Sequence, residues 1–215
     1  TTYILPIFSS AWIAKKSKAK LIYEVRDLWP ASPIEISGKS KHHPFFIIIA
    51  LAQRYAVKYA DSVVSTLRYA DQYFTQNVLK PNSFFHIQNG IDLDFFEKKT
   101  EKKGKTFHEI HEIKQNYKGC VGYTGSFGDA NGIQTLLGSA PELAKEKLAI
   151  VLVGRGIRKL EFENYVALHK LTNVFIFDAV SKNEIAPITK LFDIGYSGGV
   201  KRLVHDYGIS PNKVF

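Results

Sequence analysis

Two series of short apolar runs, separated by longer helical patterns, restrict this chain to an α/β architecture. In the first series, β-branched and aromatic runs at residues 21–25, 62–65 and 84–88 predict strands. Helical patterns at residues 44–60 and 68–79 lie between them. Strands that alternate with helices form parallel sheets, because each helix carries the chain back to the start of the next strand. The first series therefore predicts a parallel sheet with crossover helices.

The second series begins after a break in composition. Residues 97–105 contain no apolar side chain, which predicts a solvated connection. Beyond it we expect strands at residues 120–123, 148–153, 174–177 and 193–196, and helices at residues 132–147, 158–170 and 183–191. No short repeat or low-complexity tract indicates another organisation. The sequence thus predicts two Rossmann-like lobes, with a first lobe at residues 1–92, a basic connection at 93–117 and a second lobe at 118–215.

The composition indicates the redox compartment of the protein and the charge of its binding partner. The 215 residues are 45% hydrophobic, enough to bury a core, and the single cysteine, Cys120, excludes an internal disulfide and suits a reducing compartment. A net charge of +9 favours an anionic partner. The basic residues are spread over loops and the connection, so nucleic acid is not the expected partner. The longest apolar run, residues 45–52, is far shorter than the roughly 20 residues that span a bilayer.

Residues 207–215 have the features of an anion site. They combine a glycine turn, a hydroxyl group, a proline suited to a first helical turn and Lys213. Helix N-termini present free backbone N–H groups and a positive dipole end to an anion, and a lysine adds a formal charge. Because the motif stops at the start of the expected helix and the chain holds no methionine, we expect a fragment of a longer protein.

Four loops of the second series follow predicted strands, where open α/β sheets bind their ligands. The first, residues 124–132, is rich in glycine, and the second, residues 154–159, places Arg155 between two glycines. Glycines let backbone N–H groups approach phosphates, and an arginine donates to phosphates bidentately. Neither loop has the spacing of a Walker motif or of the dinucleotide fingerprint. Taken alone, a structural turn and a surface arginine explain these loops equally well.

The other two loops extend the pattern. Residues 178–182 are unremarkable by composition, whereas residues 197–202 end in Lys201 and Arg202. Basic groups in several strand-end loops of one lobe indicate a nucleotide that carries a diphosphate.

In the first lobe, Asp27 follows a predicted strand, where a carboxylate can bind or deprotonate a hydroxyl group. An Asx turn that stabilises the loop is the alternative. The histidines do not have metal-ligand spacing, so solvated or hydrogen-bonded roles are expected for them.

Taken in order, these segments resemble the retaining glycosyltransferases of family 4, in the branch that assembles bacterial surface polysaccharides such as lipopolysaccharide and capsule. Such enzymes have the GT-B architecture of two Rossmann-like lobes, and the resemblance implies that both lobes are incomplete in this chain. Each motif is modest by itself, but their order and spacing cover nearly the whole chain. The motifs are residues 26–30, 60–64, 89–92, 123–128, 153–156, 173–175 and 207–215.

The resemblance implies transfer, with retention, of a hexosyl or N-acetylhexosaminyl group from a UDP-linked nucleotide sugar to a glycan or polyprenyl-linked acceptor. The second lobe would bind the donor and the first lobe the acceptor. No metal cofactor would be required, because cationic side chains would stabilise the departing diphosphate. The implied catalytic residues are Lys213, Arg155 and Asp27. The implied donor-binding residues are Gly125, Ser126, Phe127, Gly128, Val180, Lys201, Arg202, Ser210, Pro211 and Asn212.

The sequence departs from the family pattern at several positions. Residues 131–134 replace the usual pair of arginine and lysine, and Arg155 occupies a position that is often acidic. The acidic residue that grips the ribose would follow Phe215. A non-catalytic or degenerate GT-B-like nucleotide-binding module is therefore the alternative.

A polyprenyl-linked acceptor implies that an otherwise cytoplasmic protein touches the inner face of the cell membrane. An apolar block at residues 45–49 and lysines at positions 15, 16, 18, 20, 39 and 41 fit such contact. Each basic residue near an anionic leaflet contributes about 1 kcal/mol. A buried core helix is the alternative for the apolar block, because continuous apolarity suits full burial.

Overall fold

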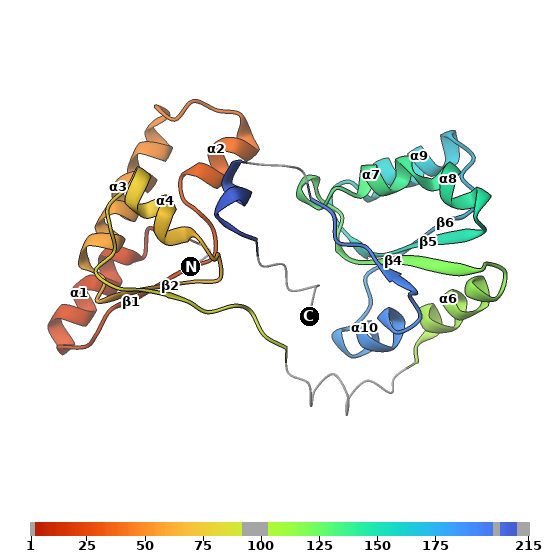
Figure 1. The fold of residues 1–215 in the computed structure, drawn as a ribbon, viewed down its shortest axis with the longest axis horizontal. Coiled ribbons are helices and arrows are strands. Elements are labelled where there is room, and N and C mark those ends of the chain that lie inside the picture. The colour runs from red at the N-terminus through yellow and green to blue at the C-terminus, as the bar shows by residue number, and fades with distance from the viewer. Residues whose placement is uncertain (1–2, 92–102, 200–202, 210–215) are drawn as a thin grey trace. The chain divides into compact units, whose positions relative to one another are not determined.

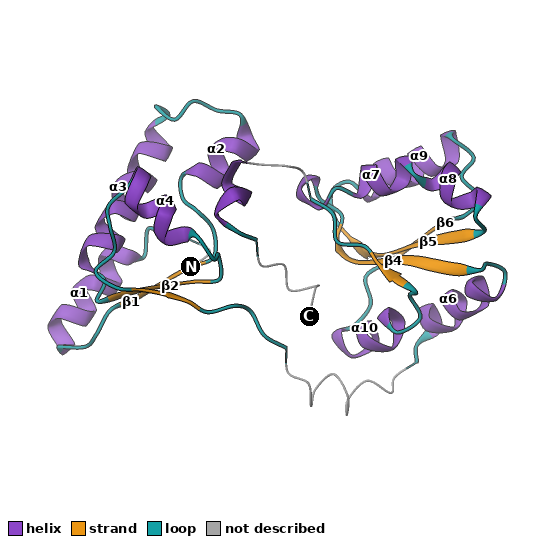
Figure 2. Ribbon diagram, viewed as in Figure 1, coloured by secondary structure: helices purple, strands orange, loops and turns teal. Residues whose placement is uncertain are grey.

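The computed structural model describes residues 3–91, 103–199 and 203–209 (Figure 1). These residues form two units, one of residues 3–90 with 203–209 and one of residue 91 with 103–199. Each unit has a single parallel sheet with helices packed against it (Figure 2). The predicted α/β class with parallel sheets is confirmed.

The first unit is built on three parallel strands in the order β1-β2-β3. These are β1 (Ile22–Val25), β2 (Ser62–Ser65) and β3 (Phe84–His86). Its helices are α1 (Ile7–Ser17), α2 (Ala31–Ser37), α3 (Pro44–Tyr59) and α4 (Ala70–Asn77), and the last three lie on one side of the sheet (Figure 1). The predicted strands and the helices α3 and α4 are present, whereas α1 and α2 were not predicted. In the core, the inward-facing strand residues pack against the inner faces of α3 and α4.

Helix α3 explains the apolar block at residues 45–49. The helix begins at Pro44, and the ring Nδ1 of His43 accepts a hydrogen bond from the Phe45 N–H at 3.3 Å. Within the block, Phe46 and Ile49 are buried, while Phe45, Ile47 and Ile48 remain about half exposed. The block is thus divided between the core and the surface. None of the described helices is long and apolar enough to cross a membrane.

Residues 203–209, which lie in the range 118–215 that the sequence analysis groups as one lobe, pack against the first unit. The Tyr207 ring meets the Tyr73 ring edge-on at 5.2 Å, and its hydroxyl lies 3.2 Å from the Gln76 side-chain oxygen. The Tyr69 N–H donates to the Tyr207 carbonyl oxygen at 2.9 Å. Gly208 follows with φ +113°, and a side chain there would meet the backbone of Arg68. This segment therefore belongs to the core of a unit far from it in sequence.

The second unit is built on four parallel strands in the order β6-β5-β4-β7. They are β4 (Gly119–Ser126), β5 (Leu148–Arg155), β6 (Val174–Phe177) and β7 (Ile194–Gly195). One face carries α7 (Ile133–Gly138), α8 (Ala140–Lys145) and α9 (Lys159–Leu168), and the other carries α6 (Lys105–Gln115) and α10 (Lys182–Thr189) (Figure 1). Because both faces are covered, β5 is almost wholly buried, and β4 is buried from Gly119 to Tyr123.

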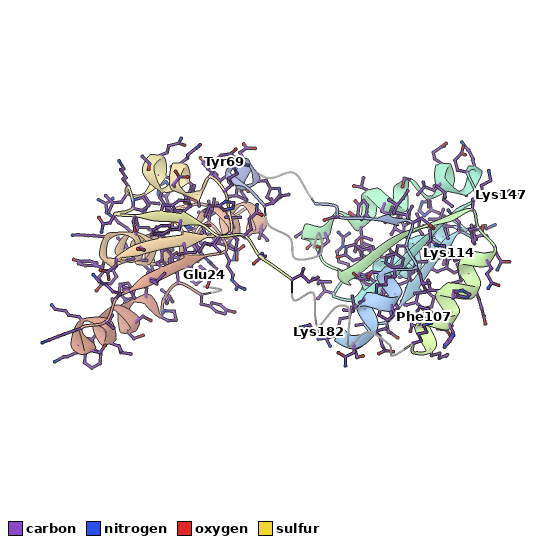
Figure 3. The ribbon with its side chains drawn as sticks, turned by 60° about the horizontal axis from the view of Figure 1, so that its bottom comes forward. Glu24, Tyr69, Phe107, Lys114, Lys147 and Lys182 are labelled. Atoms are coloured by element: carbon purple, nitrogen blue, oxygen red, sulfur yellow. The ribbon has the colours of Figure 1, made fainter. Side chains whose placement is uncertain are left out.

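Helix α6 lies inside the basic connection predicted at residues 93–117. Its residue Ile110 is fully buried against Val151 of β5. Lys114, labelled in Figure 3, donates to the Asp193 carboxylate at 2.9 Å, and the Cys120 N–H donates to the second oxygen of that carboxylate at 2.8 Å. Lys114, and then the Cys120 N–H, hold the pKa of Asp193 below its usual range. Asp193 therefore connects α6, β4 and the start of β7.

The helix predicted at residues 132–147 is two helices. Helix α7 ends at Gly138 and α8 begins at Ala140, with Ser139 between them. Pro141 in the first turn of α8 has no backbone N–H and cannot continue a preceding helix. The change of direction brings Ala140 into the core of the sheet face.

Asn173, at the entry to β6, makes a buried polar connection that we expect to matter for stability. Its side chain is 2% exposed, and Nδ2 donates to the carbonyl oxygens of Ala140 and Leu148, both at 3.0 Å. Asn173→Leu leaves both carbonyls without this donor, so the free energy of unfolding should fall by about 1–3 kcal/mol in urea denaturation. Asn116→Ala is the control, because the Asn116 side chain donates to the Glu112 carbonyl on an exposed helix end, and a change within about 0.5 kcal/mol is expected. Equal stability of Asn173→Leu and the wild type would contradict the prediction.

Candidate functional site

A cavity of about 540 Å³ lies at the carboxyl ends of β4 and β5. This is the edge of an open α/β sheet at which ligands bind. The strand ends pair in register, with Gly125 opposite Gly154 and Ser126 opposite Arg155. The loop after β6 closes the cavity with residues 179–181, and Ile185 of α10 completes the wall. Of the predicted site residues, Gly125, Ser126, Arg155 and Val180 therefore meet around one cavity.

The two glycine loops meet backbone to backbone. A Cβ added to Gly154 would lie 1.8 Å from the Gly125 carbonyl oxygen, and one added to Gly156 would lie 2.3 Å from the Phe127 carbonyl oxygen. Real Cβ atoms do not come so close to backbone atoms. The glycines at positions 154 and 156 are therefore required by packing between the loops, in addition to any role toward a ligand.

Carbonyl oxygens of the loop at residues 125–132 are held by protein donors. The Ser126 oxygen accepts from the Tyr123 hydroxyl at 2.7 Å and from Nδ2 of Asn131 at 2.9 Å. The Gly132 oxygen accepts from the Tyr196 hydroxyl at 2.8 Å. Burial raises the pKa of Tyr123 to about 12, so that this hydroxyl remains a donor at neutral pH. With these negative ends of the peptide dipoles occupied, the loop is better suited to an anion than to a cation.

Phe127 shapes this loop from the inside. Its side chain is fully buried, with its ring 6.1 Å from that of Phe162, and its N–H donates to the Arg155 carbonyl oxygen at 2.8 Å. Neither its side chain nor its N–H is available to a ligand. Gly128, which has extended backbone, leads from Phe127 into the short 3₁₀ turn at Asp129–Asn131.

Arg155 differs from its basic neighbours in its electrostatic surroundings. Arg158 and Lys159, in the same loop and helix start, are each paired with carboxylates. Arg155 is exposed and lines the cavity, and none of the described residues forms an ion pair or side-chain hydrogen bond with its guanidinium. Among the described residues of the second unit, Arg155 is therefore the cation in this cavity that could pair with an anion.

The third side of the cavity combines an apolar wall with a helix start. Val180 and Ile185 supply the wall. Ser181 caps α10, whose third residue, Glu184, accepts from the Ser181 N–H and hydroxyl at 3.2 and 2.6 Å. An apolar surface beside a strand-end loop suits the flat face of a base, which fits the predicted place of Val180.

The remaining predicted residues lie elsewhere. Asp27 belongs to the first unit, where it is exposed in the turn after β1. Neighbouring Arg26 is paired with Glu24 at 2.8 Å. No group of three or more His, Cys, Asp or Glu side chains suited to a metal ion occurs in the described ranges. Outside the described residues lie Lys201, Arg202, Ser210, Pro211, Asn212 and Lys213.

Comparison with known proteins shows which solved structures share the fold of this chain. No protein-family model matches the chain, and no curated protein matches it by sequence. Among solved structures it is similar to Anabaena HepE in complex with UDP, with a TM-score of 0.66 and 17% identity over 93% of this chain and 52% of HepE. WaaG, a glycosyltransferase involved in lipopolysaccharide biosynthesis, gives a TM-score of 0.62 and 15% identity over 90% of this chain and 58% of WaaG.

Sucrose-phosphate synthase from Thermosynechococcus elongatus extends the likeness, with a TM-score of 0.64 and 16% identity over 91% of this chain and 50% of that enzyme. These neighbours are GT-B glycosyltransferases, and the chain has their fold. It spans about half the length of the structures that it matches.

We expect the contact between the two glycine loops to resist even a methyl group. Gly154→Ala forces a Cβ against the Gly125 carbonyl, so the free energy of unfolding should fall by about 1–3 kcal/mol, measured by circular dichroism in urea. Gly138→Ala is the matched control, because a Cβ there meets no atom within 4 Å and alanine favours the helix. A Gly154→Ala protein as stable as the wild type would show that the loops are not in contact.

Proposed function

We propose that this chain is part of a retaining glycosyltransferase of family 4 that takes a sugar from a UDP-linked donor. The observation that carries the proposal is the cavity at the carboxyl ends of β4 and β5, with a glycine loop on one side and, on another, Arg155, which has no ion-pair partner among the described residues. The GT-B fold of the chain and the UDP bound to the similar structure of HepE support this reading. The proposed donor lobe, predicted at residues 118–215, corresponds to the second unit, which also includes helix α6 from the predicted connection at 93–117. The proposed acceptor lobe, predicted at residues 1–92, corresponds to the first unit, which also includes residues 203–209.

The proposed chemistry depends on positive charge rather than on a metal ion. Arg155 contacts the donor diphosphate, with Gly125, Ser126 and Gly128 facing it, and the base lies against Val180. Lys213 neutralises the charge that develops on the leaving UDP, and Asp27 binds or deprotonates the acceptor hydroxyl. The loop that carries Phe127 would be ordered from within by its buried ring. Additional diphosphate contacts are proposed for Lys201, Arg202, Ser210, Pro211 and Asn212.

A non-catalytic nucleotide-binding module is the second candidate. It is favoured by Asn131 and Gln134, which stand where the resembling enzymes carry a basic pair, and by the engagement of both side chains within the protein. Turnover distinguishes the candidates. The transferase, tested as the whole protein, should release UDP from UDP-glucose or UDP-N-acetylglucosamine only when an acceptor is present, and a binding module should release none.

Arg155→Ala should weaken the binding of UDP without affecting the fold. The loss of hydrogen bonds between a guanidinium and a diphosphate should raise the Kd of UDP by about 10- to 100-fold in isothermal titration calorimetry. Lys118→Ala, which removes one exposed positive charge on the entry side of β4, controls for the effect of net charge and should leave the Kd within about twofold. A Kd unchanged by Arg155→Ala would contradict the diphosphate assignment.

We also propose a glycan or polyprenyl-linked acceptor, and peripheral contact of the first unit with the cytoplasmic face of the membrane. Support comes from α1, where Trp12 is 62% exposed, Ile13 is also exposed and the Lys16 ammonium lies 5.9 Å from the Trp12 ring. Exposed aromatic side chains beside lysines suit an interface with anionic headgroups. Further lysines at positions 15, 18 and 20 follow on the same segment.

Flotation of the protein with anionic and with neutral vesicles tests this contact. The wild type should bind the anionic vesicles, and Trp12→Ala combined with Lys16→Glu should reduce that binding by about tenfold. Leu168→Ala, which removes an exposed apolar side chain from the second unit, is the control and should bind as the wild type does. Equal and negligible binding of the wild type to both kinds of vesicle would remove the membrane proposal.

A further inference from the structure

Arg158 joins the glycine loop at residues 125–132 to helix α9. Its Nε donates to Oε2 of Glu161 at 2.7 Å and its Nη2 donates to the other oxygen of the same carboxylate. On the opposite side, Nη1 lies 3.0 Å from Oδ1 of Asp129, a residue of the glycine loop. The guanidinium covers the buried ring of Phe162 at 5.3 Å, and the side chain is 19% exposed. Two carboxylates thus neutralise this arginine.

The backbone of Arg158 contacts the same loop. Its N–H donates to the Phe127 carbonyl oxygen at 3.2 Å, two residues before Asp129. At the far end of the loop, Nε2 of Gln134 donates to Glu161 at 3.1 Å. Arg158 and its partner Glu161 therefore hold the loop near its start, at its middle and just past its end.

We propose that Arg158 is a positioning residue, which fixes the loop at residues 125–132 relative to Arg155 and so prepares the cavity for a diphosphate. This inference rests on the proposed function and names the residue that preorganises its site. Arg158 acts through Asp129 and does not contact the ligand, because both of its neutralising carboxylates occupy its guanidinium. A loop that is held before binding loses little conformational entropy on binding, and this lowers the Kd.

The structure separates this arrangement from an ordinary surface ion pair. Exposed pairs contribute little, since two mobile side chains must be ordered in water. Here the contact to Glu161 is bidentate, the guanidinium rests on a buried ring, and the arginine contacts both helix α9 and the glycine loop. The effect expected from its loss is therefore on the loop, and through it on binding.

A double-mutant cycle with Asp129→Asn and Arg158→Gln tests the proposal. Calorimetric titration of the whole protein with UDP should give a Kd raised about 3- to 10-fold by each single substitution. The pair should raise the Kd no further than Arg158→Gln alone, because Arg158→Gln already removes the contact through which Asp129 acts. Lys145→Gln is the control, since it breaks an ion pair with a similarly short N···O distance, 2.7 Å, on α8, away from the loop. It should leave the Kd within about twofold. Penalties that add, or single variants with the wild-type Kd, would overturn the proposal.

Amide hydrogen exchange of residues 125–132 without ligand is a second, independent test of whether Arg158 holds the loop. Exchange should be faster in Arg158→Gln than in the wild type and unchanged in Lys145→Gln, at a temperature where all three proteins are folded. Should the wild type fail to bind UDP, the proposed function fails. The exchange measurement then still decides the positioning role, and unchanged exchange in Arg158→Gln would overturn it.

Discussion

The contact between the backbones of β4 and β5 at their carboxyl ends is the constraint on which the candidate site depends. The Gly125 carbonyl oxygen occupies the space that a Cβ of residue 154 would need, so the two strands end side by side. Helices on both faces of the sheet hold this pair of strands in place. The glycine loop therefore leaves from a fixed frame, and donors from Tyr123, Asn131 and Tyr196 determine where its carbonyl groups point. Among the described residues that line the cavity, Arg155 is the charged one, and it has no ion-pair partner among them.

The sheets could be predicted from the sequence because parallel strands covered on both faces are continuous apolar runs. The run at residues 148–153 is such a strand, and the structure buries nearly all of it. Helices with little buried surface give no such signal. Helix α2 buries no residue fully, and α1 buries only Ile7. Helix α6 was not recognised among its lysines, histidines and glutamates. Phe107, Ile110 and Ile113 recur every three residues, and the first two of them pack into the core.

The loops of the candidate site could be predicted, but the role of each side chain could not. Glycines between a strand and a helix indicate that the backbone there comes close to a neighbouring group. At Gly154 and Gly156 this group is the backbone of the glycine loop at residues 125–132. Arg155 and Arg158 are equivalent in the sequence. They are distinguished by the contacts that Arg158 makes with Asp129, Glu161 and the ring of Phe162. The family resemblance implied that Phe127 faces the donor. In the structure its side chain is buried, with its ring beside that of Phe162 in a later helix.

The return of residues 203–209 to the first unit makes that unit discontinuous along the chain. Tyr207 fills a place beside Tyr73, and Val204 also packs against the same core. A gene cut once in the stretch between β3 and α6 would not separate the two units, because the amino-terminal product would lack part of its own interior and the carboxyl-terminal product would carry an apolar tail with nothing to cover it. Gene fusions, domain swaps and truncations in this protein must therefore treat the first unit as two separate pieces of sequence.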